Sequence, residues 1–295
     1  MFEQRLGRVL RYGYVLPDHV KGVIIFFTGL NDIAEKYFET VHWAIAQGYG
    51  VFILDWYGQG GSGRYLDNPH KRHGDAFDND VDDAKQWIED VVKPISDGLP
   101  MFLLGHSMGG NLVMRLLMRR EHKFAGAILT APMFGIKALR YIPKIIVRAA
   151  HRFFSTAYVV GGADWMEIQH LPPKMSILTK DEMRCDVEKQ WMKHNDTLRI
   201  GGITYGWLYQ AWQSCRRIDA FDFSGFQTPC LIFTVQHEHL VDNRAIHRIA
   251  RRIPHTTVRT LKDSYHEPLL ERDAIRDILL EEMDEFMNNL MPKSD

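Results

Sequence analysis

Short runs of consecutive apolar residues, separated by helical patterns, limit the fold of this chain more than any other feature. The runs are residues 23–27, 51–54, 101–104, 127–129 and 231–235, with a sixth expected at 258–261. A strand that is apolar at every position, and not only at alternate ones, is buried on both faces. Such strands separated by helices predict an α/β fold, a mostly parallel sheet with helices on both faces.

Helical spacing fills the intervals between these strands. Residues 34–47 carry apolar side chains on one stripe and are followed by Gly48, a common helix terminator. Residues 81–91 repeat the pattern before the third strand, and we expect Pro94 to end that helix. The last helix is expected to begin near Arg272. This alternation of strand and helix supports the parallel arrangement.

Residues 133–225 interrupt the alternation. They contain no convincing buried strand, and they carry four of the seven tryptophans, Trp165, Trp191, Trp207 and Trp212. We interpret this segment as a helical cap inserted between two strands of the sheet. The predicted division is therefore a core of residues 1–132 and 226–295 and a cap of residues 133–225.

Charge and composition exclude several classes of function. Lysine and arginine total 36 against 37 acidic residues, so the net charge of −1 does not suggest a nucleic-acid-binding protein. Cys185, Cys215 and Cys230 are far apart, which argues against a disulfide framework or a zinc-thiolate site. No apolar run approaches the ~20 residues of a membrane-spanning helix, and Glu3 and Arg5 interrupt a signal-like start. We expect a globular cytoplasmic protein.

The motif Gly105-His106-Ser107-Met108-Gly109 carries the most information about chemistry. It follows the strand at 101–104 directly and precedes a helical run. In such a strand–turn–helix context, small flanking residues let the serine adopt a strained conformation that exposes its hydroxyl. The helix also directs its first N–H groups to the place where negative charge develops. Ser107 is therefore the candidate nucleophile.

A serine nucleophile needs a base, and the base needs an orienting carboxylate. In a sheet of this kind the chain order is serine, acid, histidine. His266 lies between the last predicted strand and the last helix, so we expect it to be the base. Glu238 lies just beyond the strand at 231–235 and is the candidate acid. Asp242 is the alternative acid, and it is equally suited to cap a helix that begins near Asn243.

Several further segments carry a resemblance to a known family. They are residues 55–64 (DWYGQGGSGR), 129–135 (LTAPMFG), 201–205 (GGITY) and 265–271 (YHEPLLE). With the serine motif, they make the chain resemble α/β-hydrolases of the lysophospholipase L2 type, in the broader group of monoacylglycerol lipases and S33-type serine aminopeptidases. The resemblance covers nearly the whole chain. It implies an α/β-hydrolase fold with Ser107 as nucleophile, His266 as base and Glu238 as acid.

The same resemblance implies a serine ester hydrolase, a lysophospholipase or monoacylglycerol hydrolase that uses no cofactor. A peptidase or small-ester carboxylesterase on this fold is one alternative, and a non-catalytic binding protein that kept the fold is another. The chain departs from the family at Glu238, where relatives usually have aspartate, and at Thr28, where they often have histidine before Gly29. The loop after the first strand is expected to supply one oxyanion-hole N–H from Leu30, and Met108 the other.

Two motifs suggest other functions that we reject. Residues 58–63 (GQGGSG) fit the Gly-x-Gly-x-x-Gly nucleotide fingerprint, but a nucleotide site needs these glycines to open a helix, and residues 64–74 are loop-like. We expect a tight turn beside the active site instead. The acidic residues at 78–82 resemble a calcium loop, but acidic residues are also favoured at the start of a helix. We therefore expect no metal site.

Residues 133–163 contain five basic residues and no acidic residue. The basic residues recur every three or four positions and are Lys137, Arg140, Lys144, Arg148 and Arg152. Pro143 is expected to divide the segment into two short helices. A basic amphipathic helix can lie on an anionic membrane surface, so we expect peripheral membrane contact through residues 136–153. The alternative is an ordinary solvated face of the cap.

Overall fold

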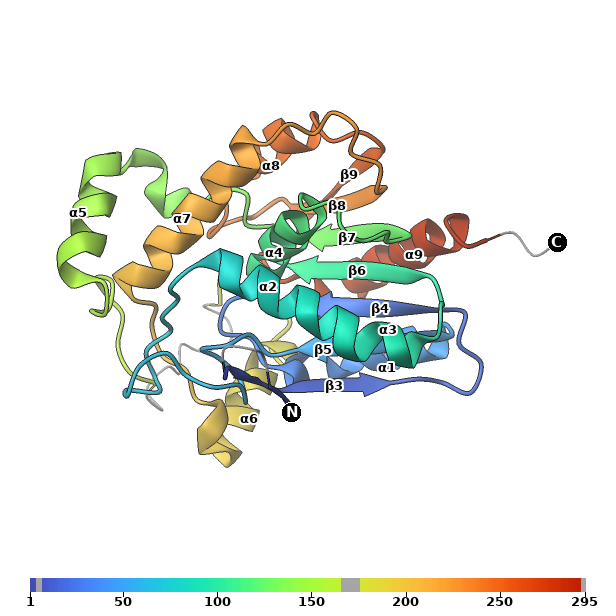
Figure 1. The fold of residues 1–295 in the computed structure, drawn as a ribbon, viewed down its shortest axis with the longest axis horizontal. Coiled ribbons are helices and arrows are strands. Elements are labelled where there is room, and N and C mark those ends of the chain that lie inside the picture. The colour runs from blue at the N-terminus through green and yellow to red at the C-terminus, as the bar shows by residue number, and fades with distance from the viewer. Residues whose placement is uncertain (4–6, 166–175, 293–295) are drawn as a thin grey trace.

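A sheet of seven strands organises the chain (Figure 1). The computed structural model describes residues 1–3, 7–165 and 176–292. Across the sheet the strands are β3 (Tyr12–Val15), β5 (Tyr49–Leu54), β4 (Gly22–Phe27), β6 (Met101–His106), β7 (Gly126–Thr130), β8 (Cys230–Val235) and β9 (Thr256–Leu261). All neighbours are parallel except β3 and β5. The predicted mostly parallel sheet is confirmed.

The strands that the sequence does not reveal lie at the edges. β3 is an edge strand in which three residues are half-buried and Tyr14 is exposed, so it lacks a continuous buried run. A separate antiparallel pair, β1 (Phe2–Glu3) and β2 (Val9–Leu10), is too short to show a pattern. In contrast, β4, β5, β7 and β8 are buried at every residue, as expected for strands covered on both faces.

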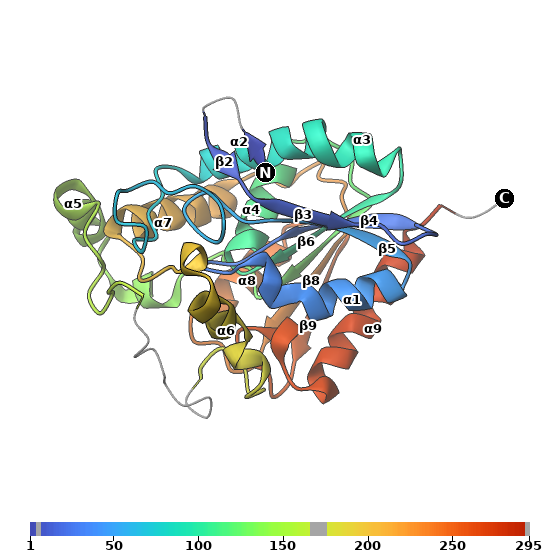
Figure 2. The ribbon, with the colours of Figure 1, turned by 90° about the horizontal axis from the view of Figure 1, so that it is seen from below.

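Helices cover both faces of the sheet. Figure 2 shows α1 (Phe38–Ala46) and α9 (Asp273–Asn289) on one side and α2 (Phe77–Trp87) and α3 (Lys93–Ser96) on the other. The side with α2 also holds α4 (Met108–Leu117) and α8 (Asn243–Ala250), because their apolar side chains share one buried cluster. A second cluster joins α9 to the opposite face of the strands. The sheet therefore separates two cores.

Pro94 does not end the helix in which it lies, contrary to the prediction. The helical path runs from α2 through a π-helical turn at Ile88–Val92 into α3, and Pro94 falls in the first turn of α3. Proline lacks the N–H that would bond to the preceding turn, and the π-helical turn directly before Pro94 is where the regular hydrogen-bond pattern of the helix changes. The helix ends at Asp97 and Gly98, which both have positive φ.

The segment between β7 and β8 is helical in its described part. Its elements are η3 (Lys137–Tyr141), α5 (Lys144–Phe154), η5 (Arg184–Asp186), α6 (Val187–His194), η6 (Asp196–Leu198) and α7 (Tyr205–Ala220). α5 and α6 lie beyond the carboxyl ends of the strands (Figure 1). The last helix, α7, contributes Trp207, Ala211 and Ile218 to the same core as α4. The division at residue 225 stays a prediction; Arg5 and residues 166–175 lie outside the described residues.

The order of the strands determines where a site can form. β4 and β6 are neighbours, with Phe27 paired to Gly105, but the helices that follow them cover opposite faces of the sheet. Loops that leave two adjacent strands toward opposite faces create an opening at the carboxyl edge, where ligands bind in open α/β sheets. The loops that begin at Thr28 and Ser107 therefore lie side by side.

Candidate active site

Ser107 occupies a sharp turn between β6 and α4. Its backbone has φ +49° and ψ −112°, a strained conformation for a residue with a side chain. The turn is held by its neighbour strand, because the Ser107 N–H donates to the carbonyl of Thr130 at 3.0 Å. The Ser107 carbonyl in turn accepts from Met133 N–H at 2.9 Å. Contacts to both sides of the turn maintain this strained conformation, in which the hydroxyl lies 2.9 Å from His266 Nε2.

The flanking glycines are required by close backbone contacts. A Cβ atom at Gly109 would lie 1.9 Å from the Phe27 carbonyl oxygen, and one at Gly105 would lie 2.8 Å from the Gly109 carbonyl oxygen. No side chain fits at these distances. The motif therefore lets α4 start directly against the end of β4 and beside the loop that follows it.

His266 links the serine to a carboxylate. Its Nε2 lies 2.9 Å from Ser107 Oγ, and its Nδ1 lies 2.8 Å from Glu238 Oε2. All three side chains are buried, so little water competes for these hydrogen bonds. Because an ionised carboxylate only accepts, the proton of the imidazole is on Nδ1, and Nε2 is free to accept the serine proton.

Glu238 is held in place by the turn that follows β8. Its Oε1 accepts hydrogen bonds from the N–H groups of Leu240 at 2.8 Å and Val241 at 3.1 Å. Burial would raise the pKa of Glu238, but the hydrogen bond from His266 and these two N–H groups lower it below the usual range. The carboxylate is therefore ionised at neutral pH and stabilises positive charge on the imidazole.

Asp242, the alternative acid, has another role in the structure. It is the N-cap of α8, and its Oδ1 accepts from the N–H of Arg244 at 3.0 Å. Glu238, earlier in the same turn, is the carboxylate that bonds to the imidazole. The structure thus brings Ser107, Glu238 and His266 together and leaves Asp242 at the helix start.

Leu30 and Met108 occupy the two adjacent loops, as the prediction of an oxyanion hole requires. Leu30 follows β4, and its N–H donates no hydrogen bond to another described residue. Met108 is the first residue of α4, so its N–H has no acceptor within the helix. Free N–H groups on both segments are what an oxyanion hole needs, and the assignment of Leu30 and Met108 to it stays a prediction.

His266 lies in the loop of residues 265–271, which Glu271 closes and which we call the histidine loop. The Oε1 of Glu271 accepts from Tyr265 N–H at 2.8 Å and from Lys180 N–H at 3.3 Å. The N–H of Glu267 donates to the Leu178 carbonyl at 2.8 Å. The histidine loop is therefore braced on one side by its own glutamate and on the other by the segment inserted between β7 and β8.

A buried group of charges that the sequence analysis missed connects the two loops of the site. Lys36 Nζ lies 2.5 Å from Asp32 Oδ1 and 2.6 Å from Glu267 Oε1. Asp32 Oδ2 accepts from Gly29 N–H and from Tyr37 Oη, both at 2.6 Å. In the sequence, the only indication of this ion pair is the spacing of Asp32 and Lys36, which are four residues apart. Glu267, at the far end of the chain, has no such local signal.

His106 is a second buried imidazole in the site. Its ring centroid lies 5.1 Å from that of His266, and its Nδ1 lies 3.0 Å from Thr130 Oγ1. Burial lowers the pKa of His106 to about 3, and the nearby His266 adds to the effect. His106 is therefore neutral at neutral pH and does not compete with His266 for a proton. Among the described residues no cluster of three or more potential ligands could hold a metal ion.

The fold and this geometry define a serine hydrolase of the α/β-hydrolase class. The sequence matches the family described as serine aminopeptidase S33 (Hydrolase_4) over residues 18–273. The chain belongs to this family.

Individual relatives agree with the assignment. The chain is 31% identical to lysophospholipase L2 of Escherichia coli K12 over 292 residues, which cover 95% of this chain and 84% of that protein. It is 26% identical to a probable lysophospholipase L2 of Haemophilus influenzae over 276 residues, 91% of this chain and 84% of the relative. The fold is similar to a monoglyceride lipase of Saccharomyces cerevisiae, with a TM-score of 0.78 and 15% identity over 97% of this chain and 94% of that one.

The neutral state of His106 predicts how stability depends on pH. Its pKa in the folded protein, about 3, is below its ordinary value of 6.5, so the unfolded chain binds the proton more readily. The stability that this group contributes is present above pH 6.5 and is lost as the pH falls toward 3. Between pH 7 and 5, wild type should lose about 2 kcal/mol more unfolding free energy than His106→Gln, measured by urea denaturation. His42→Gln, at an exposed histidine of α1, should match wild type; equal pH dependence of all three proteins would contradict the prediction.

Proposed function

We propose that this serine ester hydrolase cleaves the fatty-acyl ester of a lysophospholipid, with Ser107 as nucleophile, His266 as base and Glu238 as orienting acid. The observation that carries the proposal is the continuous hydrogen-bonded chain from Ser107 Oγ through His266 to Glu238. The substrate class is supported by the relatives named lysophospholipase L2, which align along nearly the whole chain.

The reaction would proceed in two acyl-transfer steps. Ser107 Oγ attacks the ester carbonyl while its proton passes to His266 Nε2, and the N–H groups of Leu30 and Met108 stabilise the oxyanion. The intermediate collapses when the ester C–O bond breaks and the alcohol takes the proton from His266. A water molecule gives a proton to the same imidazole and attacks the acyl-enzyme; the acyl bond to Ser107 Oγ then breaks, the serine takes the proton from His266, and the fatty acid is released. Glu238 stabilises the imidazolium in both steps.

Residues 133–225 would act as a cap over this site. The segment at 176–180 supports this role, because the Leu178 carbonyl and the hydroxyl of Thr179 bond to the histidine loop and to Leu270, respectively. Its α6 also carries Trp191, whose ring contacts Phe38 with centroids 6.0 Å apart. A cap that is attached to the histidine loop and to α1 can shape the space available to an acyl chain.

The same segment would contact an anionic membrane surface through residues 136–153. Pro143 divides this stretch into η3 and α5, as predicted. On α5, Ile145, Ile146 and Phe153 are 70%, 54% and 72% exposed, so these apolar side chains do not pack on the core. Exposed apolar residues alternate with Lys144, Arg148 and Arg152, a combination that suits a lipid interface with negative headgroups. None of the helices within the described ranges has the length and apolar character needed to cross a bilayer.

Ser107→Ala should abolish ester hydrolysis without unfolding the protein. Loss of the nucleophile should lower turnover by at least about 10⁴-fold on a panel of lysophospholipid, monoacylglycerol, p-nitrophenyl ester and aminoacyl amide. A fluorophosphonate probe should label wild type and Ser224→Ala, a control at an exposed turn, but not Ser107→Ala. Wild-type turnover by Ser107→Ala would refute the catalytic assignment; fastest turnover on the amide would indicate a peptidase.

Glu238→Gln should lower kcat by about 10³–10⁴-fold, because a neutral amide neither selects the imidazole tautomer nor stabilises its cation. Asp242→Asn should stay within about twofold of wild type, since asparagine also caps helices well. Both variants are compared with wild type in the same lysophospholipid assay. A severe loss confined to the Asp242 variant would transfer the acid role to that residue.

Replacing Lys144, Arg148 and Arg152 with glutamine should weaken binding to vesicles that contain phosphatidylglycerol. Each lost cation is expected to remove about 1 kcal/mol, so co-sedimentation should fall by at least about 10-fold at low salt. Turnover of a short water-soluble ester should be unchanged.

The control is a second triple variant, in which Lys21, Lys123 and Arg251 at the opposite end of the strands are replaced with glutamine. It changes the net charge by the same amount. It should sediment like wild type. Equal sedimentation of the two triple variants would show that the α5 face is ordinary surface.

A further inference from the structure

The rejected nucleotide fingerprint, residues 58–63, forms a loop beside the proposed oxyanion hole. It follows β5, the neighbour of β4, so it lies next to the loop at residues 29–32. Its Gln59 is fully buried, although a glutamine side chain has four hydrogen-bonding positions to satisfy. We call residues 29–32 the oxyanion loop.

The side chain of Gln59 bonds to the oxyanion loop at three points. Its Nε2 donates to the carbonyl of Gly29 at 2.8 Å and to the carbonyl of Asp32 at 2.9 Å. Its Oε1 accepts from the N–H of Asn31 at 3.0 Å. These partners stand on both sides of Leu30, whose own N–H is left free. Gln59 thus fixes the peptide groups around Leu30 without using the N–H that would bind the oxyanion.

Arg72 determines which way the amide of Gln59 faces. Its Nε, which can only donate, lies 3.0 Å from Gln59 Oε1. If the amide turned over, its NH₂ group would face this donor and the carbonyls of Gly29 and Asp32 would lose theirs. A second nitrogen of Arg72, Nη2, lies 3.9 Å from the sulfur of Met108. One buried guanidinium therefore touches residues on both sides of the proposed oxyanion hole.

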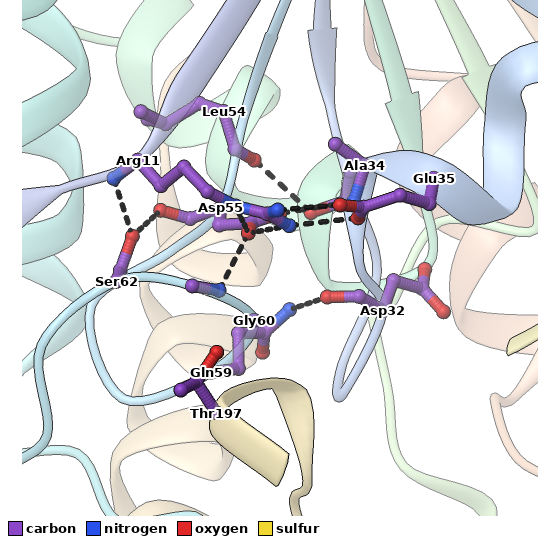
Figure 3. Close-up of polar contacts among 12 residues, drawn as sticks. Arg11, Asp32, Ala34, Glu35, Leu54, Asp55, Gln59, Gly60, Ser62 and Thr197 are labelled. Atoms are coloured by element: carbon purple, nitrogen blue, oxygen red, sulfur yellow. Dashed lines mark hydrogen bonds and ion pairs between the residues drawn. The ribbon is translucent and has the colours of Figure 1, made fainter. Parts of the chain in front are cut away.

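A buried carboxylate, and not a nucleotide, explains the glycine at position 60 of this loop. Asp55 accepts from the N–H of Gly61 at 2.8 Å and pairs with Arg11, as Figure 3 shows. A Cβ atom at Gly60, which has φ +53°, would lie 2.2 Å from Asp55 Oδ2. The loop wraps tightly around Asp55, and this tight turn directs Gln59 toward the oxyanion loop (Figure 3).

The oxyanion loop has reason to need this support. Asn31 adopts φ +64°, a conformation that costs free energy for a residue other than glycine. A hydrogen bond from Gly29 N–H to the side chain of Asp32 closes the turn from within. Gln59 adds three hydrogen bonds from outside, at the positions where the turn would otherwise relax.

We propose that Gln59 is a positioning residue for hydrolysis, which holds the N–H of Leu30 in the direction that stabilises the oxyanion. The inference rests on the proposed function, because it assumes that the oxyanion forms at Ser107. The side-chain hydrogen bonds of Gln59 go to the oxyanion loop and to Arg72, and not to Ser107, His266 or Glu238, so Gln59 acts through its neighbours and not on the reacting atoms.

The test is Gln59→Glu, which keeps the size of the side chain and replaces its two N–H donors with an acceptor. Removing an oxyanion donor outright costs about 10²–10³-fold in kcat, and a misdirected donor should cost about 10–100-fold. KM for lysophospholipid should stay within about twofold, because the loop contacts the transition state more than the ground state.

A purely structural role would not separate transition-state from ground-state binding. The dissociation constant of an alkylboronic acid, which forms a tetrahedral adduct with the serine, should rise at least about 10-fold in Gln59→Glu. That of a non-hydrolysable ether analogue of lysophospholipid should be unchanged. Gln59→Met, uncharged and of similar length, provides a second variant should the glutamate unfold the loop, and the same changes are expected.

Ser62→Ala is the matched control from the same loop. Ser62 Oγ bonds to the carbonyl of Asp55 and the N–H of Arg11, and to no residue of the oxyanion loop. Its kinetics and boronate affinity, corrected for the folded fraction, should match wild type.

Two results would overturn the inference. One is unchanged kcat and boronate affinity in folded Gln59→Glu or Gln59→Met; the other is an equal loss in Ser62→Ala. If wild type itself neither hydrolyses esters nor binds the boronic acid, the proposed function fails, and the inference fails with it. If wild type hydrolyses esters and binds the boronic acid, and the Gln59 variants do both as well as wild type, only the inference fails.

Discussion

The close contact between the start of α4 and the end of β4 is the constraint on which the site depends. Gly109 approaches the Phe27 carbonyl so closely that no side chain could stand there. This contact puts the first turn of α4 beside the loop that follows β4, the two segments that carry Met108 and Leu30, the proposed oxyanion-hole residues. The strained backbone of Ser107 follows from the same geometry, since the chain must reverse within one residue between β6 and α4.

Around this contact, buried polar groups hold the loops that local structure would leave free. Gln59 supports the oxyanion loop from one side, and Asp32, paired with Lys36, supports it from within. Lys36 also reaches Glu267, next to His266, so one cation joins the oxyanion loop to the histidine loop. Breaking a buried pair of this kind typically costs about 3–5 kcal/mol, because the partner charge remains buried without compensation. The cost makes such loops well ordered relative to each other.

The inserted segment connects this chemistry to the surface. Its residues 176–180 bond to the histidine loop, while α5 presents apolar and basic side chains outward at the carboxyl end of the strands. α7 packs against the sheet side of the molecule, because Trp207, Ala211 and Ile218 share a buried cluster with α4. The segment is thus attached to the sheet through α7 and exposed through α5, an arrangement that would let a lipid surface and the serine be approached from one side.

The sequence by itself determined the parallel sheet, the strand–turn–helix context of Ser107 and the position of His266. Each of these depends on residues that are close together in the chain, where the spacing of apolar side chains indicates which elements are buried. It could not choose between Glu238 and Asp242, since both follow β8; only the path of the turn decided which carboxylate reaches the imidazole. The edge strand β3 stayed hidden because a half-buried strand has no continuous apolar run. The sequence does not predict the buried contacts of Gln59 with the oxyanion loop or of Lys36 with Glu267, which lies 231 positions away. Only tertiary packing brings these polar side chains together with their partners.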